Sequence, residues 1–68
     1  MNTDIRKYII ENFKDDNENE LKESLDDSVS EKLEEALPGL GVFMEIIWEN
    51  ANDELKKELL SILKAHLN

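Results

Sequence analysis

Apolar residues recur along the first part of this chain at intervals that are typical of an α-helix. Four of them lie at positions i, i+3, i+4 and i+8, on one helical face: Ile5, Tyr8, Ile9 and Phe13. Thr3 is a suitable N-cap, and Asp4 would stand at the positive end of the helix dipole. We therefore predict a first helix over residues 3–14, ended by the turn-forming residues that follow.

A second apolar stripe recurs every four residues after this acidic turn: Leu21, Leu25, Val29 and Leu33. Asn17 followed three positions later by Glu20 matches a capping box, so we predict that this helix begins at about residue 18. Ser28 and Ser30 weaken the helix. The sequence leaves open whether the helix continues beyond Ser30 or gives way to a short turn over residues 31–36.

Proline and two glycines precede the most apolar segment of the chain. Pro38 disfavours a helical conformation at Leu37, and glycine tolerates positive φ. We therefore predict a turn over residues 37–41, with Gly39 or Gly41 at positive φ. The helix predicted to follow, over residues 42–50, is apolar around about 240° of its circumference. Because such a helix is usually buried, we expect it to be the structural centre.

The last segment again has one apolar side. Asn52 and Asp53 are expected to open a helix that runs to about residue 66, with its apolar side formed by Leu55, Leu59, Ile62, Leu63 and His66. The predicted fold is all-α and consists of one small domain over residues 1–68. It is a bundle of four short helices, with a Pro-Gly-x-Gly turn before a largely buried third helix.

The charge of the chain excludes some kinds of partner. The 68 residues carry 17 acidic and 8 basic side chains, for a net charge of −9. Residues 15–36 hold ten acids against two lysines, which gives −8 for that stretch. A surface of this sign opposes nucleic acids and anionic membranes. There is no cysteine, and no apolar run approaches the ~18 residues of a membrane span, so we expect a soluble protein of the cytoplasm.

Three local patterns suggest chemistry, and each has a simpler explanation. The acidic turn over residues 15–20 has the spacing of an EF-hand loop, but Glu20 stands where that loop needs glycine. Gly39-Leu40-Gly41 lacks the lysine and third glycine of a phosphate loop, and we interpret it as a turn. His66, the only histidine, suits a helix C-terminus. We therefore predict no enzyme activity, cofactor or metal site.

The apolar residues of the third predicted helix allow two interpretations. Core packing is the default for Phe43, Met44 and Trp48. The same residues would form a recognition patch for another protein if they were exposed. If the other helices do not cover this helix, we expect a homodimer or an unidentified protein partner to do so.

The centre of the chain resembles the I-type minor small acid-soluble spore proteins of endospore-forming bacteria. In that family a Leu-Pro-Gly-Leu-Gly-Val turn runs into an apolar, Glu-containing helix that ends in Ile-Trp. The matching residues here are Leu37, Pro38, Gly39, Leu40, Gly41, Val42, Phe43, Met44, Glu45, Ile46, Ile47 and Trp48. The opening Ile5-Arg6 segment, the acidic turn before Leu21 and the closing leucines are also similar. Residues 26–35 are more acidic than is typical of the family.

The resemblance implies a place and a time rather than a mechanism. It implies synthesis in the forespore and retention in the spore core, with a non-enzymatic structural or accessory role in sporulation or spore outgrowth. The alternative is an acidic helical interaction module that docks through the surface around Phe43, Met44 and Trp48. DNA binding is the third hypothesis, and the negative charge argues against it.

Overall fold

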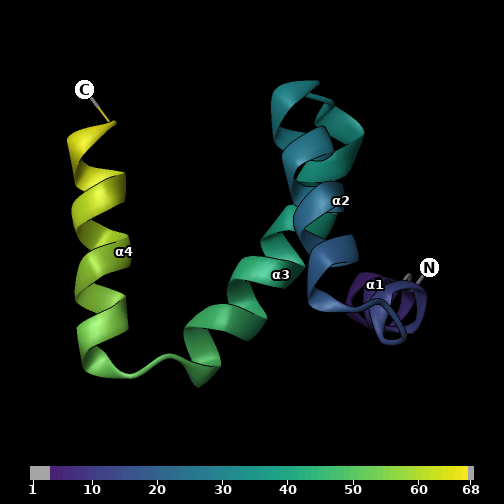
Figure 1. The fold of residues 1–68 in the computed structure, drawn as a ribbon, viewed down its shortest axis with the longest axis horizontal. Helices are drawn as coiled ribbons and strands as arrows, with labels where there is room; N and C mark the ends of the chain where they lie inside the picture. Colours follow the sequence, from purple (N-terminus) through teal and green to yellow (C-terminus); the bar gives the residue numbers. More distant parts are fainter. Residues whose placement is uncertain (1–3, 68) are drawn as a thin grey trace.

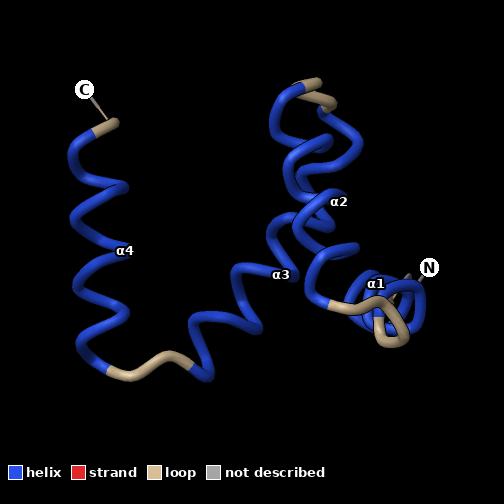
Figure 2. Tube along the Cα trace, in the orientation of Figure 1, coloured by secondary structure: helices blue, strands red, loops and turns tan. Residues whose placement is uncertain are grey.

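A computed structural model describes residues 4–67, which form α-helices joined by short connections (Figures 1 and 2). The elements in chain order are α1 (Ile5–Phe13), α2 (Glu18–Ser30), the 3-10 helix η1 (Glu34–Ala36), α3 (Leu37–Asn50) and α4 (Asp53–Ala65). No strand occurs in residues 4–67. The predicted all-α fold with four helices is confirmed.

Side-chain caps fix where three of the helices begin. Asp4 caps α1 and accepts a hydrogen bond from the backbone N–H of Lys7 at 3.0 Å, whereas the cap predicted at Thr3 lies outside the described residues. The capping box predicted for α2 is confirmed: Asn17 and Glu20 each accept a bond from the other's backbone N–H at 2.9 Å. Asn52 caps α4 by accepting from Leu55 at 2.8 Å.

The chain reverses at residues 31–33 rather than at the Pro-Gly segment. α2 ends at Ser30, which settles the question that the sequence left open. Lys32 then adopts a left-handed conformation with φ of 51°, and Leu33 is extended. These two residues turn the chain before η1, so the acidic stretch ends in a short loop and a single 3-10 turn.

The turn predicted over residues 37–41 is wrong, because these residues form the beginning of α3. Pro38 lies in the first helical turn, where its missing N–H would have no intrahelical partner and its fixed φ suits the helix. Neither Gly39 nor Gly41 has positive φ. The Pro-Gly signal therefore marks a helix start, and α3 is five residues longer at its N-terminus than predicted.

The expectation that the third helix is largely buried is also wrong. α3 is central, since it contacts both α1 and η1, but Val42 is the only buried hydrophobic residue within residues 4–67, at 7% exposure. Four of its other large side chains are 37–46% exposed: Met44, Ile46, Ile47 and Trp48. The reason lies in the path of α4, which stands away from α3 after a short linker (Figure 1). One side of α3 consequently has no helix over it.

Candidate interaction site

The N-terminal half of α3 packs on α1 through its most enclosed residues. Val42 is buried, and the ring of Phe43 meets that of Phe13 edge to face, with centroids 5.1 Å apart and planes at 81°. The Ile9 side chain of α1 packs close to Gly39, where an added Cβ would lie 3.3 Å from its Cδ1. These contacts place the family motif in a helix–helix interface.

A bidentate ion pair closes one side of the same interface. Nε and Nη2 of Arg6 donate to the two carboxylate oxygens of Glu45 at 2.6 and 2.8 Å. These hydrogen bonds and the positive charge of Arg6 lower the pKa of Glu45 below its usual range. The same contacts raise the pKa of Arg6. Glu45 is thereby held as a carboxylate that fixes α3 against α1, which is a structural use of a charge inside the motif.

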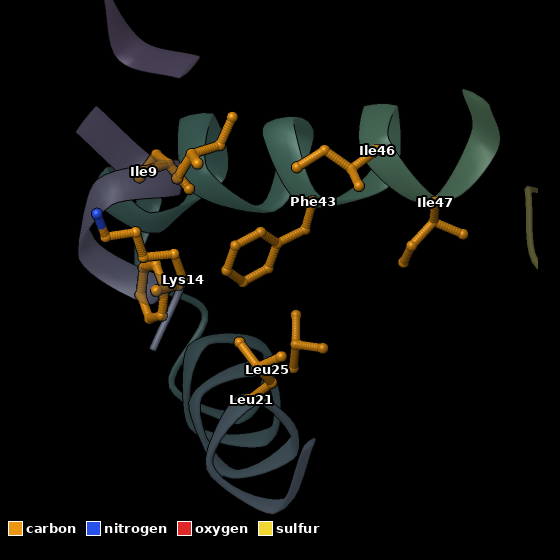
Figure 3. Close-up of a pocket in the computed structure, with 9 residues that line it drawn as sticks. Ile9, Lys14, Leu21, Leu25, Phe43, Ile46 and Ile47 are labelled. Carbon is orange, nitrogen blue, oxygen red and sulfur yellow. The ribbon is translucent and has the colours of Figure 1, made fainter. Parts of the chain in front are cut away.

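An apolar groove opens between α1, α2 and α3 (Figure 3). It has a volume of about 270 Å³, and its lining is apolar except for the end of one lysine. In Figure 3 Phe43 points from α3 toward α2, while Leu21 and Leu25 stand on the opposite wall. The groove is lined by Ile9, Ile10, Phe13, Lys14, Leu21, Leu25, Phe43, Ile46 and Ile47. It is therefore a hydrophobic surface that the described chain leaves open to water.

The C-terminal half of α3 carries a second exposed apolar area beside the groove. Met44, Ile47 and Trp48 are 37–46% exposed, so they are only partly covered. The ammonium group of Lys56, from α4, lies 5.1 Å from the centre of the Trp48 ring, a distance suited to a cation–π contact. Trp48 therefore contacts α4 near its N-terminus, and the rest of α4 extends away from α3 (Figure 1).

α4 presents an apolar side that is mostly exposed. Leu55, Leu60, Ile62 and Leu63 are 41–62% exposed, and Leu59 is half-buried. An amphipathic helix normally buries such a side against another element. The described chain therefore has three apolar surfaces without full cover: the groove, the C-terminal half of α3 and the apolar side of α4.

Three of the polar residues considered for chemistry, Asn17, Glu20 and His66, are used in helix caps. Asn17 and Glu20, from the acidic turn, bond to each other's backbone as the α2 capping box. Among residues 4–67 no group of three or more potential ligands is placed to hold a metal ion. His66 is the C-cap of α4, where Nδ1 lies 2.8 Å from the carbonyl oxygen of Ile62. None of the helices in this part of the chain is long and apolar enough to cross a membrane.

The predicted motif residues all lie on α3, but they do not share one environment. Gly39, Val42, Phe43 and Glu45 face α1, whereas Ile47 and Trp48 remain exposed. Sequence reasoning missed the partner of Glu45, because Arg6 lies 39 positions away. It also missed the groove, which three separate helices build. The apolar periodicity of each helix was the only signal of it.

Several known proteins of one name have sequences similar to this chain. The family model for small, acid-soluble spore protein I matches residues 3–67. Proteins of that name from Bacillus velezensis and Bacillus subtilis are each 34% identical over 67 residues, covering 98% of this chain and 94% of each relative. The one from Halalkalibacterium halodurans is 37% identical over 59 residues, 87% of each chain. No solved structure matches. The chain belongs to the small, acid-soluble spore protein I family.

Proposed function

We propose that this protein is a non-enzymatic component of the spore core, with a structural or accessory role in sporulation or spore outgrowth. The observation that carries the proposal is the match over residues 3–67 to proteins that are named small, acid-soluble spore protein I. The use of the motif supports it. Gly39, Val42, Phe43 and Glu45 serve the protein's own helix packing, and none of them is set aside for a reaction or a ligand in the described contacts.

Localisation during sporulation tests this proposal. A fluorescent fusion expressed from the gene's own promoter should be absent from growing cells, arise in the forespore, and remain in the spore after chemical removal of the coat. A fusion of an unrelated protein to the same promoter controls for timing. Signal throughout vegetative growth, or loss of the signal with the coat, would contradict the proposed place.

A spore role can be tested separately from location. Spores that lack the gene should contain the same enzymes but differ in resistance or in the rate of outgrowth, and a wild-type copy should restore the parental behaviour. Spores that are indistinguishable from the parent in every stage of germination and outgrowth would remove the accessory role.

The second candidate function is an acidic helical module that docks onto another protein. The exposure of Met44 and Trp48, together with the open groove beside Phe43, favours it. The two candidates differ in what the apolar surface does. A storage or packing component has no need of that surface, whereas a docking module loses its function when a charge is placed there.

A further inference from the structure

The chain exposes more surface than a compact protein of its mass. Its accessible surface is 6146 Å², whereas a folded monomer of 7.9 kDa would expose about 4,400 Å². The radius of gyration agrees: it is 13.3 Å, against about 11 Å for a compact chain of 68 residues. The single chain therefore carries an excess of about 1,700 Å² on this comparison.

Two of the exposed apolar surfaces of this extended chain suit each other. One is the groove between α1, α2 and α3, which is lined by apolar side chains (Figure 3). The other is the apolar side of α4, where residues at i, i+4, i+7 and i+8 form a stripe: Leu55, Leu59, Ile62 and Leu63. A helix with such a stripe is what an open groove between helices accepts.

The linker between α3 and α4 keeps these two surfaces apart within one chain. Ala51 has φ −83° and ψ 144°, and Asn52 has φ −81° and ψ 174°, so both residues are extended. Two consecutive extended residues carry the chain away from α3 instead of reversing it. In Figure 1 α4 accordingly rises on the opposite side of α3 from α1 and α2. Most of its apolar side is exposed as a result, with Ile62 at 62% and Leu63 at 53%, so a second molecule has access to it.

We propose that two copies of this chain exchange α4, so that the apolar side of α4 from each copy fills the groove of the other. Exchange of one element between identical chains is a common route to a symmetric dimer, since both copies gain the same contacts. The proposal stands on the geometry of the chain and does not depend on where in the cell the protein acts.

Charge and area are consistent with a second copy as the occupant. α2 carries five acids against Lys22, so the groove wall that it forms would repel an acidic helix. α4 has three lysines and three acids, so it approaches α2 without net repulsion. The excess of two copies, about 3,400 Å² in all, is an upper bound on the area that the exchange removes from water. An interface of half that area would still be of standard size.

Sedimentation analysis of the full chain at micromolar concentration tests the proposal, with two matched variants. The wild-type protein should sediment at twice its 7.9 kDa mass. Ile62→Glu should weaken the dimer by roughly tenfold or more. Ser61→Glu places the same charge about 100° round the same helix, outside the apolar stripe, and should leave the dimer intact. Since Ile62 is 62% exposed in the single chain, its replacement has no reason to unfold a monomer.

Cross-linking distinguishes exchange of α4 from any other dimer. The chain has no cysteine, so single cysteines can be introduced cleanly. A chain with Leu25→Cys, on the groove wall, should form a disulfide with a chain carrying Ile62→Cys. The pairing of Leu25→Cys with Ser61→Cys should be much slower. Equal rates for the two pairs would overturn the exchange.

A longer linker provides an independent measurement. A short Gly-Ser insertion between Ala51 and Asn52 should let α4 fold back into its own groove, which converts the dimer to a compact monomer of unchanged helix content. A dimer that persists after the insertion would contradict the exchange. A wild-type protein that is monomeric, or that sediments as a dimer unaffected by Ile62→Glu, would overturn the proposal as a whole.

Discussion

Arg6 of α1 and Glu45 of α3 are joined by two hydrogen bonds of 2.6 and 2.8 Å, although 39 positions separate them in the chain. Lys22 and Asp26 form a contact of 2.6 Å as well, but both residues belong to α2. The first pair ties two helices together, whereas the second spans neighbouring turns of one helix. Loss of the first pair would therefore weaken the contact between α1 and α3, whereas loss of the second would affect α2 alone.

Glu45→Gln is expected to lower the melting temperature at pH 7, and Asp26→Asn should lower it less. Because Arg6 depresses the pKa of Glu45, the stabilisation is fully present above the usual glutamate pKa of about 4.3. It is lost as the pH falls through the depressed pKa of the folded state. Thermal melts of wild type and Glu45→Gln should therefore converge in acid. A constant difference down to the lowest pH would show that the ion pair is not its source.

Gly41→Ala should stabilise the protein by about 0.5–1 kcal/mol, because glycine inside a helix is unfavourable relative to alanine. A Cβ at Gly41 meets nothing within 4 Å. Gly39→Ala should gain less, since its Cβ would press on Ile9 at 3.3 Å. Urea denaturation of the two variants checks the order. Destabilisation by Gly41→Ala would point to the positive φ expected from the sequence.

Val42→Ala should reduce the free energy of unfolding by about 2 kcal/mol, through lost burial and a small cavity. Val29→Ala removes the same groups from a side chain that is 59% exposed, so it should be nearly neutral. Chemical denaturation with equal m-values would make the comparison direct. Similar losses at both positions would mean that Val29 is covered in solution.

Calcium should leave the melting temperature unchanged. The side-chain oxygen of Asn17, at a ligand position of the EF-hand spacing, already accepts a backbone hydrogen bond in the capping box. Glu20, which stands where that loop needs glycine, accepts the second bond of the box. Coordination would break these bonds and expose the start of α2. Melts in millimolar calcium and in millimolar magnesium check the prediction. A rise of several degrees with calcium alone would contradict it.

Binding to duplex DNA should be weak or absent at physiological salt. The net charge is −9, and α2 places five acids on one short helix. Such a surface repels phosphates, whose neutralisation supplies most nonspecific affinity. A mobility-shift titration, with a basic DNA-binding protein as the positive control, tests this expectation. Saturable binding that weakens steeply with salt would overturn it.

Local signals in the sequence predicted the helices themselves more successfully than the contacts between helices. The apolar periodicity of α1, α2 and α4 and the caps at Asn17 and Asn52 each depend on residues a few positions apart. The predicted start of α3 was wrong because proline is common both in β-turns and in the first turn of a helix, where Pro38 lies. The left-handed Lys32, which actually reverses the chain, has no side-chain signal for that conformation.

The burial of α3 and the groove were beyond sequence reasoning for another reason. The pattern of α3 indicates that its residues favour an apolar environment, but it does not indicate what provides one. Whether Met44 and Trp48 are covered depends on the direction of α4, which the dihedral angles of Ala51 and Asn52 determine. Likewise, the Arg6–Glu45 pair requires α1 to cross α3 at one particular place.

The exposure of α4 also bears on how the protein unfolds. α4 has 13 residues, and isolated helices shorter than about 12–15 residues are marginal in water. Without a neighbour along most of its length, its amide protons should exchange with solvent far sooner than those around Val42. Heating a separated chain should therefore melt α4 first and the α1–α3 contact later, as two events. Association would couple them into one cooperative transition whose midpoint rises with protein concentration.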